Sequence, residues 1–251
     1  MDEAALKTYL DEQVERYNHT DFIVDDPISI PHLFERKADI EIIGYIIATI
    51  SWGQRKTIIK NGHLLCEIMG QSPQEFVLHA KKEDLRDLKF VHRTFNADDL
   101  RFFIEALKRF YETGGGLEAG FNKNTATMSD RIAGFRQLFL ETPHEKRAEK
   151  HLSNPLTGSA SKRINMFLRW MVRNDKKGVD FGLWNTISPA ELYIPLDVHT
   201  GNVARKLGLI KRKANDWKAL EELMERVRTF DPVDPCKYDF ALFGLGASGT
   251  F

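Results

Sequence analysis

The sequence predicts an all-α protein, and three observations lead to this prediction. Apolar residues recur at intervals of three and four along most of the chain, which is the spacing of one helix face. The clearest case is Ile43, Ile46, Ile47 and Ile50, whose helix is expected to end near Trp52. We find no internal repeat, no heptad array and no convincing β-hairpin signal. The hydrophobic fraction of 42%, with 17 Phe, is ample for a packed core.

The same apolar spacing predicts the helices in order along the chain. They cover 4–17, 43–50, 58–69, 73–79, 98–111, 129–140, a segment beyond Gly158, one after Asp197, 217–229 and 238–245. A loop rich in Asp and Pro is expected over 25–31, and a charged loop over 174–178. The run Gly114, Gly115 and Gly116 has no Lys-Ser/Thr after it and no strand before it. It therefore predicts a flexible connection and not a phosphate-binding loop.

The length of 251 residues suits one helical domain made of two lobes. We place one lobe, a helical barrel with a hairpin, at roughly 40–173, and the other at roughly 1–39 together with 174–251. No stretch approaches 18 uninterrupted apolar residues, and the chain starts with acidic residues unlike a signal peptide. We therefore expect a cytoplasmic monomer without membrane contact.

The cysteine content limits the cofactors that the chain is expected to bind. Cys66 and Cys236 are far apart and belong to no Cys-x-x-Cys pair. Disulfide frameworks, zinc sites and iron–sulfur clusters all need more closely spaced ligands. We expect no bound metal and no iron–sulfur cluster.

Positive charge is concentrated in one part of an otherwise neutral chain. Residues 151–215 hold 11 Lys and Arg against 4 Asp and Glu, whereas the whole chain holds 36 of each kind. A basic segment in a neutral protein indicates an anionic partner that binds one face. An ordinary cluster of surface charge is the alternative.

The most informative single stretch is 195–209, which begins with a proline and predicts a short helix. Asp197 lies at the start of this helix, and Gly208 suits the left-handed position after its end. A carboxylate there accepts hydrogen bonds from backbone N–H groups, and the helix dipole keeps it ionised. A fixed ionised carboxylate can stabilise a developing cation or activate water. The alternative is that Asp197 serves only as a helix cap.

A second segment, residues 156–168, predicts a helix, a tight hairpin and another helix. Together with the Asp197 segment it resembles the DNA glycosylase superfamily of endonuclease III and the 8-oxoguanine glycosylases. In that superfamily a Leu-Pro-Gly-x-Gly-x-Lys-x-x-Asn pattern precedes an Asp-x-His run, in this order. Here Lys162 and Asn165 match the first pattern, and Asp197 and His199 match the second.

The resemblance implies a two-lobed helix-hairpin-helix fold and a function in DNA base-excision repair. Lys162 would be the nucleophile of an AP lyase, and Asp197 would stabilise the sugar cation as a flipped, damaged base leaves. The helix dipole at Lys162 disfavours the ammonium form, which would favour attack on a sugar carbon. Gly158, Ser159, Ala160 and Ser161 would bind a backbone phosphate of double-stranded DNA, and His199 would also contact the DNA. The alternative for Lys162 is an ordinary surface lysine.

The chain departs from the superfamily pattern in three respects. Ala160 replaces the second hairpin glycine, which leaves open both the tight turn and a monovalent cation bound by hairpin carbonyls. Lys162 and Asp197 are 35 positions apart, which implies an insertion around 174–188. The C-terminal cluster cysteines are absent, as in the 8-oxoguanine branch. These departures favour a separate bacterial branch without an iron–sulfur cluster.

Three weaker signals add candidate DNA contacts, and the first is the segment after the helix at 43–50. Trp52 and Gln54 follow the first core helix, where relatives carry a loop that fills the gap of the flipped base. The alternative is a polar turn with a buried Trp.

His92 and Arg93 lie between Phe90 and Phe95 and are candidates for a base pocket, because aromatic and cationic side chains stack on bases. The alternative places both Phe residues in the core. A basic group is expected to contact DNA phosphates, or else to form a solvated face. It comprises Arg205, Lys206, Lys211, Arg212 and Lys213.

Two other classes of function remain open at the level of sequence. A binder of nucleic-acid structure could keep the fold without the chemistry, and it would retain DNA affinity when Lys162 or Asp197 is replaced. An α-helical protein that binds another partner would show no salt-dependent affinity for DNA.

Overall fold

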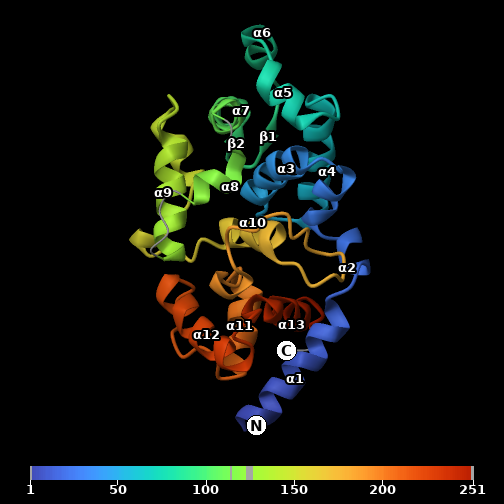
Figure 1. Ribbon diagram of the computed structural model, residues 1–251, viewed down its shortest axis with the longest axis vertical. Helices are drawn as coiled ribbons and strands as arrows, with labels where there is room; N and C mark the ends of the chain where they lie inside the picture. The colour runs from blue at the N-terminus through green and yellow to red at the C-terminus, as the bar shows by residue number, and fades with distance from the viewer. Residues whose placement is uncertain (1, 114, 123–126, 250–251) are drawn as a thin grey trace. The chain divides into compact units, whose positions relative to one another are not determined.

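The computed structural model describes residues 2–113, 115–122 and 127–249, and this part of the chain is mostly helical (Figure 1). The chain divides into two compact units. Unit 1 comprises Met1–Val24 and Pro155–Phe251, and unit 2 comprises Asp25–Asn154. These boundaries differ from the predicted lobes at two places, because the prediction grouped 25–39 with the C-terminal part and 155–173 with the central part. Because the segment after residue 154 packs with the C-terminal helices, Lys162 and Asp197 belong to the same unit.

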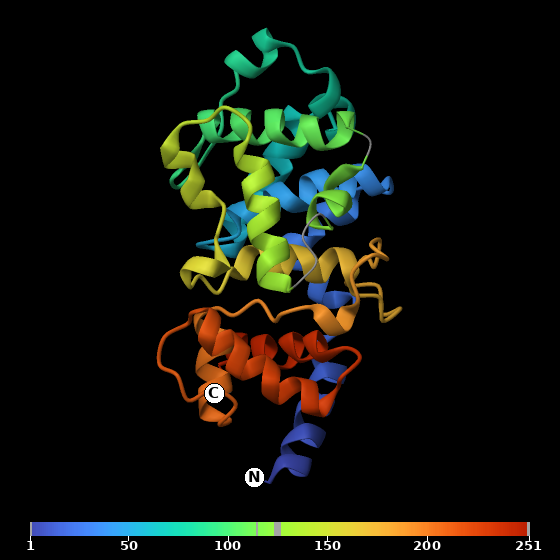
Figure 2. The same ribbon diagram turned by 60° about the vertical axis from the view of Figure 1, so that its left-hand side comes forward.

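Unit 2 is built around one helix that is buried on all sides. In α3 (Lys37–Ile50) every residue from Asp39 to Ile50 is buried, which agrees with the run of isoleucines over its second half. Tyr45 of this helix contacts the rings of Phe103, Phe135 and Phe139. The surrounding helices can be followed in Figure 2. They are η1 (Pro27–Ser29), η2 (Pro31–Leu33), α4 (Arg55–Ile68), α5 (Pro73–His79), α6 (Lys82–Arg86), α7 (Ala97–Glu112), α8 (Gly116–Phe121), α9 (Met128–Leu140) and η3 (Lys146–His151).

A small β-hairpin in unit 2 corrects the expectation that the chain has none. Strands β1 (Val91–His92) and β2 (Phe95–Asn96) pair antiparallel, with Arg93 in the left-handed region at the turn. Two residues per strand are too few to produce a readable alternation of apolar and polar residues. Phe90 and Phe95 are both buried, so the alternative that placed them in the core is confirmed.

The long helices begin and end within a few residues of their predicted limits, except that α3 begins several residues earlier. The short helices α6 and α8 were not predicted, because five or six residues span less than two turns and show little periodicity. Of the glycine run, Gly114 lies outside the described residues. Gly115 is the N-terminal cap residue of α8, so the run leads directly into a helix.

Unit 1 is organised around its last helix, α13 (Tyr238–Ala247), which packs against both α1 (Glu3–Tyr17) and α11 (Val198–Lys206). Glycines allow these close approaches. A Cβ on Gly244 would lie 2.3 Å from the Tyr17 ring, and one on Gly246 would lie 3.0 Å from the His199 Cβ. The other helices are α2 (Asp21–Val24), η4 (Pro155–Thr157), α10 (Lys162–Val172), η5 (Pro189–Glu191), α12 (Trp217–Phe230) and η6 (Pro235–Lys237). None of the helices described is both long and apolar enough to cross a membrane.

The contact between α1 and α13 gives a first testable prediction. Gly244→Ala should lower the free energy of unfolding by about 1–3 kcal/mol, because the new methyl group overlaps the Tyr17 ring. Urea denaturation measures this change. The same substitution should have a much smaller effect in a Tyr17→Ala background, where the ring is absent. Equal effects in both backgrounds would contradict the described packing.

Candidate active site

The segment from Leu156 to Ser161 forms a tight turn, but the helix predicted before it is only the single 3-10 turn η4. The turn uses two left-handed residues, Gly158 with φ 95° and Ser161 with φ 50°. Ala160 has no positive φ, so an alanine replaces the second glycine without backbone strain. Leu156 and Gly158 are exposed, whereas Ala160 and Ser161 are buried. The side chains of Ala160 and Ser161 therefore do not form the exposed surface that we predicted.

The turn is held by hydrogen bonds to its own carbonyl groups. The Gly158 carbonyl accepts from the Trp217 N–H at 3.0 Å, and the Ser159 carbonyl accepts from the Ser161 hydroxyl at 3.2 Å. The Ala160 carbonyl accepts from the Asn165 side-chain amide at 3.1 Å. All three carbonyls therefore accept hydrogen bonds from within the chain. This arrangement favours a turn that is stabilised by the protein itself over one that needs a bound cation. Asn165 thus stabilises the turn from within α10.

Lys162 is the first residue of α10, directly after the turn. Its side chain is partly buried, and its ammonium group forms no hydrogen bond or ion pair with the residues that the structure describes. The side chain of Ser161, the N-terminal cap residue, makes no capping hydrogen bond. The start of α10 therefore presents a lysine without a close carboxylate partner next to a helix N-terminus without a side-chain cap.

Asp197 is the N-terminal cap residue of α11, as the sequence predicts. One carboxylate oxygen accepts the Thr200 N–H at 2.9 Å, and the side chain is partly buried. The other oxygen has no hydrogen-bond partner among the described residues. Gly208 has φ 72° after the end of the helix, also as predicted. Capping thus fixes the carboxylate and leaves one oxygen for another role.

A short segment before α12 connects the Lys162 turn with the start of α11. The Asn215 side-chain amide donates to the Asp197 carbonyl at 3.0 Å. Asp216 forms a β-bridge with Ser159, and the Trp217 N–H binds Gly158. The three consecutive residues 215–217 therefore bind both elements that carry the predicted catalytic side chains.

Asp239, a residue that the sequence analysis missed, is a buried carboxylate of the same unit. It lies on α13 with 4% of its surface exposed, and its carboxylate accepts a hydrogen bond from Arg169 of α10. Burial raises the pKa of Asp239 to about 6, although Arg169 opposes the rise. The Asp197 carboxylate raises this pKa further and the Lys162 ammonium lowers it, so both groups lie within electrostatic reach of one carboxyl. A carboxylate inside the apolar stretch 238–245 was the available signal.

The titration of Asp239 gives a second prediction. Its carboxyl should titrate near pH 6, which carbon NMR of the side-chain carboxyl measures, with Asp239→Asn identifying the resonance. Lys162→Met should raise the midpoint and Asp197→Asn should lower it, because they remove an opposite and a like charge. Lys213→Met is the control, since this lysine is exposed in the loop after α11. If neither substitution changes the titration midpoint of Asp239, the proximity of the three groups is contradicted.

The same shift has a consequence for stability. The pKa of Asp239 in the folded protein lies above its ordinary value of 3.8. The folded state therefore binds more protons between about pH 4 and 6, and the stability that Asp239 contributes falls as pH rises through this window. Asp239→Asn should remove that part of the pH dependence.

The predicted insertion at 174–188 packs along the second half of α10. The Phe181 and Trp184 N–H groups donate to the carbonyls of Trp170 and Met171 near the helix end. Asp180 accepts from both Arg169 and Arg173, and its side chain is fully buried. The insertion therefore stabilises α10, and with it the arginine that binds Asp239.

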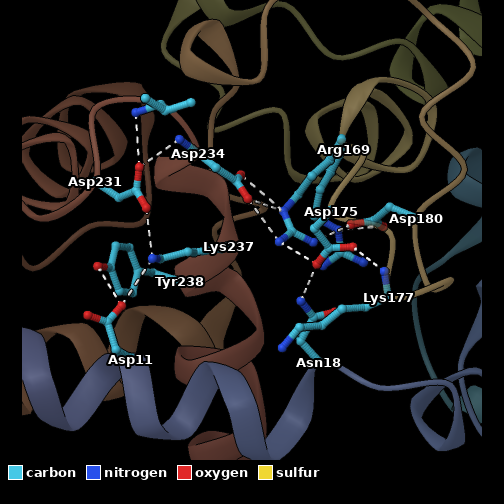
Figure 3. A network of polar contacts seen from close by, with 12 residues as sticks. Asp11, Asn18, Arg169, Asp175, Lys177, Asp180, Asp231, Asp234, Lys237 and Tyr238 are labelled. Carbon is cyan, nitrogen blue, oxygen red and sulfur yellow. Dashed lines mark hydrogen bonds and ion pairs between the residues drawn. The ribbon is translucent and has the colours of Figure 1, made fainter.

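A buried polar network extends from this insertion to α1 (Figure 3). The guanidinium group of Arg173 donates from Nε to Asp234, from Nη1 to Asp180 and from Nη2 to Asp175. Burial would raise the pKa of Asp175, but Arg173 and the hydrogen bonds from Lys177 and Asn18 lower it. Arg169 and Arg173 belong to the basic segment of the sequence. Their burial means that two of the charges counted in that segment do not lie on its surface.

Two further arginines of the predicted basic face bind groups of their own unit. Arg205 donates to the Arg212 carbonyl at 2.8 Å and to the Asn215 side chain. Arg212 forms a two-pronged ion pair with Asp216. Both therefore order the 211–216 loop, so Arg205 is less suited to phosphate contacts than we expected. Lys206, Lys211 and Lys213 are exposed, and so is His199.

Unit 2 holds the other predicted contact residues. Trp52 is partly buried against the rings of His92 and His151, at centroid distances of 5.0 and 5.8 Å. His92 is buried and lies between the Asn61 amide at its Nδ1 and the Trp52 carbonyl at its Nε2. A carbonyl only accepts, so Nε2 carries the proton and Nδ1 accepts from Asn61.

Burial lowers the pKa of His92, which favours the same neutral form. Arg93 is exposed and its guanidinium group lies against Gly53, while Gln54 is exposed at the start of α4. The structure thus brings Trp52, His92 and Arg93 together. His92 is buried with both ring nitrogens hydrogen-bonded, which leaves it little surface for a base, whereas Trp52, Gln54 and Arg93 are at least partly exposed.

Comparison with known proteins places the chain in a family. It belongs to the DUF2400 family of proteins of unknown function, and the match covers residues 26–248 and therefore most of both units. Comparisons with curated proteins and with solved structures find no match. Among the described residues, no group of three or more His, Cys, Asp and Glu side chains is arranged to bind a metal ion.

Proposed function

We propose that the protein is a DNA glycosylase with AP lyase activity that acts on a damaged base flipped out of double-stranded DNA. One observation carries the proposal: residues 215–217 bind both the turn before Lys162 and the Asp197 carbonyl, so these two residues, remote in sequence, begin neighbouring elements of one unit. Both side chains are partly buried, and each keeps at least one reactive atom without a hydrogen-bond partner among the described residues. The helix-hairpin-helix glycosylase pattern requires such a pair.

In the proposed reaction the neutral Lys162 amine attacks C1′ of the deoxyribose. The bond from C1′ to the base breaks, and the base leaves with its electron pair and takes up a proton. Asp197 stabilises the positive charge that develops on the sugar and accepts a proton from the Lys162 nitrogen. The sugar ring then opens: the C1′–O4′ bond breaks, O4′ takes up the proton that Asp197 accepted, and the Lys162 nitrogen and C1′ form an imine. Removal of a C2′ proton from this imine expels the 3′ phosphate, which leaves with the electron pair of the C3′–O bond, and hydrolysis of the imine frees Lys162.

The turn before Lys162 supports phosphate binding in this proposal. Gly158 is exposed, and the following helix has no side-chain cap, so its N–H groups and dipole suit a phosphate of the DNA backbone. Such a contact is independent of base sequence and would hold the duplex in register. Lys206, Lys211 and Lys213 would add salt-dependent attraction.

Reductive trapping tests this function. The protein is incubated with borohydride and a duplex that carries an abasic site, and then with duplexes that carry oxidised, deaminated or alkylated bases. We expect a covalent protein–DNA adduct with the abasic duplex and with at least one lesion. Salt-dependent binding without any adduct would favour the non-enzymatic binder, and the absence of binding would favour a protein without nucleic-acid function.

A further inference from the structure

We infer that Asn215 is a positioning residue for Asp197, whose backbone it ties to the segment that also holds the turn before Lys162. The inference deepens the proposed function and rests on it for the role of Asp197 in catalysis. It assigns a role to a residue that lies outside both motifs of the sequence.

The side chain of Asn215 is bound to α11 from two sides. Its Nδ2 donates to the Asp197 carbonyl at 3.0 Å, and the same carbonyl accepts the Gly201 N–H at 2.9 Å as the first hydrogen bond of the helix. Its Oδ1 accepts from the guanidinium group of Arg205, which lies later in α11. Because an arginine only donates and a carbonyl only accepts, the amide of Asn215 is held in one orientation.

Gly201 provides the space that this side chain occupies. A Cβ on Gly201 would lie 2.5 Å from the Asn215 Oδ1 and 3.0 Å from the Arg205 Nη1. The backbone of Gly201 is helical and has no positive φ, so the helix itself does not require a glycine here. Glycine within a helix lowers its stability. The close approach of Asn215 and Arg205 therefore accounts for a glycine in the first half of α11.

The two residues after Asn215 bind the turn that precedes α10. Asp216 pairs with Ser159 in a β-bridge, and the Trp217 N–H donates to the Gly158 carbonyl at 3.0 Å. Cα atoms two positions apart in a chain lie at most about 7 Å from each other. The turn and the start of α11 are therefore both bound by one short stretch of backbone.

The contact acts on the carboxylate of Asp197 through the backbone. One carboxylate oxygen caps the Thr200 N–H at 2.9 Å, and the other has no hydrogen-bond partner among the described residues. The direction of this second oxygen depends on the backbone at Asp197, which the amide of Asn215 holds at its carbonyl. Without this donor the cap would open more often, and the carboxylate would occupy a wider range of positions.

The test measures the cap in the complete protein without DNA. NMR follows hydrogen exchange of single backbone amides in the unaltered protein and in Asn215→Asp, which keeps the acceptor for Arg205 but loses the donor to Asp197. The Thr200 N–H should exchange at least about threefold faster in the variant, because one hydrogen bond that holds the cap is lost. The Ala219 N–H, which is capped at the start of α12, should exchange at an unchanged rate.

Asn202→Asp is the matched control. It adds the same charge to the surface of α11, and the exposed Asn202 side chain forms no hydrogen bond with the residues that the structure describes. Exchange at Thr200 should stay within the error of the measurement in this control. An unchanged Thr200 rate in Asn215→Asp would overturn the inference. Equal acceleration at Thr200 and Ala219 would also overturn it, because both amides would then report only a loosened 211–216 loop.

A second readout separates positioning from DNA binding. It uses the duplex whose oxidised, deaminated or alkylated base the protein releases. Asn215→Asp should lower the single-turnover rate of base release by at least about fivefold, because a small displacement of a catalytic group slows the reaction. The dissociation constant for the same duplex should match that of Asn202→Asp. A loss of affinity with an unchanged rate would contradict a positioning role.

Failure of the inference and failure of the proposed function are separable. Hydrogen exchange requires no substrate, so a protein that traps no DNA still reports whether Asn215 holds the Asp197 cap. A trapped adduct combined with unchanged exchange at Thr200 in Asn215→Asp would leave the glycosylase proposal and remove the role of Asn215.

Discussion

Replacement of Lys162 by Ala is expected to abolish the borohydride-trapped adduct with an abasic duplex. The loss should reach at least about 10³-fold, as for the removal of a covalent nucleophile in other enzymes, because no other amine in the site would form the imine. Gel separation of the adduct from free protein measures the effect. DNA binding should weaken only slightly, since the backbone N–H groups of the turn remain.

Two comparisons make this result specific to the proposed site. Lys218→Ala removes an exposed lysine of α12 that has no part in the proposed site and should leave the adduct yield unchanged. Asp197→Asn keeps the shape of the helix cap but removes the charge, so it should slow release of a damaged base more than trapping at an abasic site. An undiminished adduct in Lys162→Ala would assign the chemistry to another lysine.

Replacement of Arg173 by Met is expected to cause the largest loss of stability. The side chain is 2% exposed and binds three carboxylates, of which Asp180 is fully buried. Removal of one partner from a buried ion network leaves the others uncompensated, which costs about 3–5 kcal/mol. Urea denaturation should therefore show a large fall in the free energy of unfolding.

Lys177→Met provides the matched control for this prediction. Lys177 lies in the same insertion and pairs with Glu15 at the surface, where the Glu15 side chain is exposed and the Lys177 side chain is partly exposed. Exposed ion pairs contribute at most about 1 kcal/mol, so this variant should unfold close to the unaltered protein. Similar losses in the two variants would show that the buried network is not what stabilises α10.

The parts of the fold that sequence reasoning predicted well depend on local chemistry. The helix that starts at Asp197 needs only a capping carboxylate, a run of apolar positions and a terminal glycine, all of which are neighbours in the chain. The long helices likewise show their apolar face within one window. The β-hairpin at Val91–Asn96 was missed because its strands are too short for a pattern.

The parts of the site that were missed depend on contacts between distant residues. Asp239 is 70 positions from Arg169, and nothing near it in sequence indicates that a buried arginine will bind it. We expected Arg205 to contact DNA because the sequence does not show its intramolecular partner. Asn215 reaches the Arg205 guanidinium group only when the 211–216 loop folds back. A carboxylate within an apolar helix is nonetheless a readable sign of a buried charge pair, because an unpaired buried charge is too costly to keep.

Peptide mapping of the adduct trapped on an abasic duplex by the unaltered protein tests the central claim most directly. After digestion of the protein and the DNA, mass spectrometry locates the lysine that carries the reduced sugar. We predict a single modified peptide in which Lys162 bears the sugar. Modification of a different lysine, or of several exposed lysines in proportion to their accessibility, would contradict the assignment of Lys162 and Asp197 to one active site.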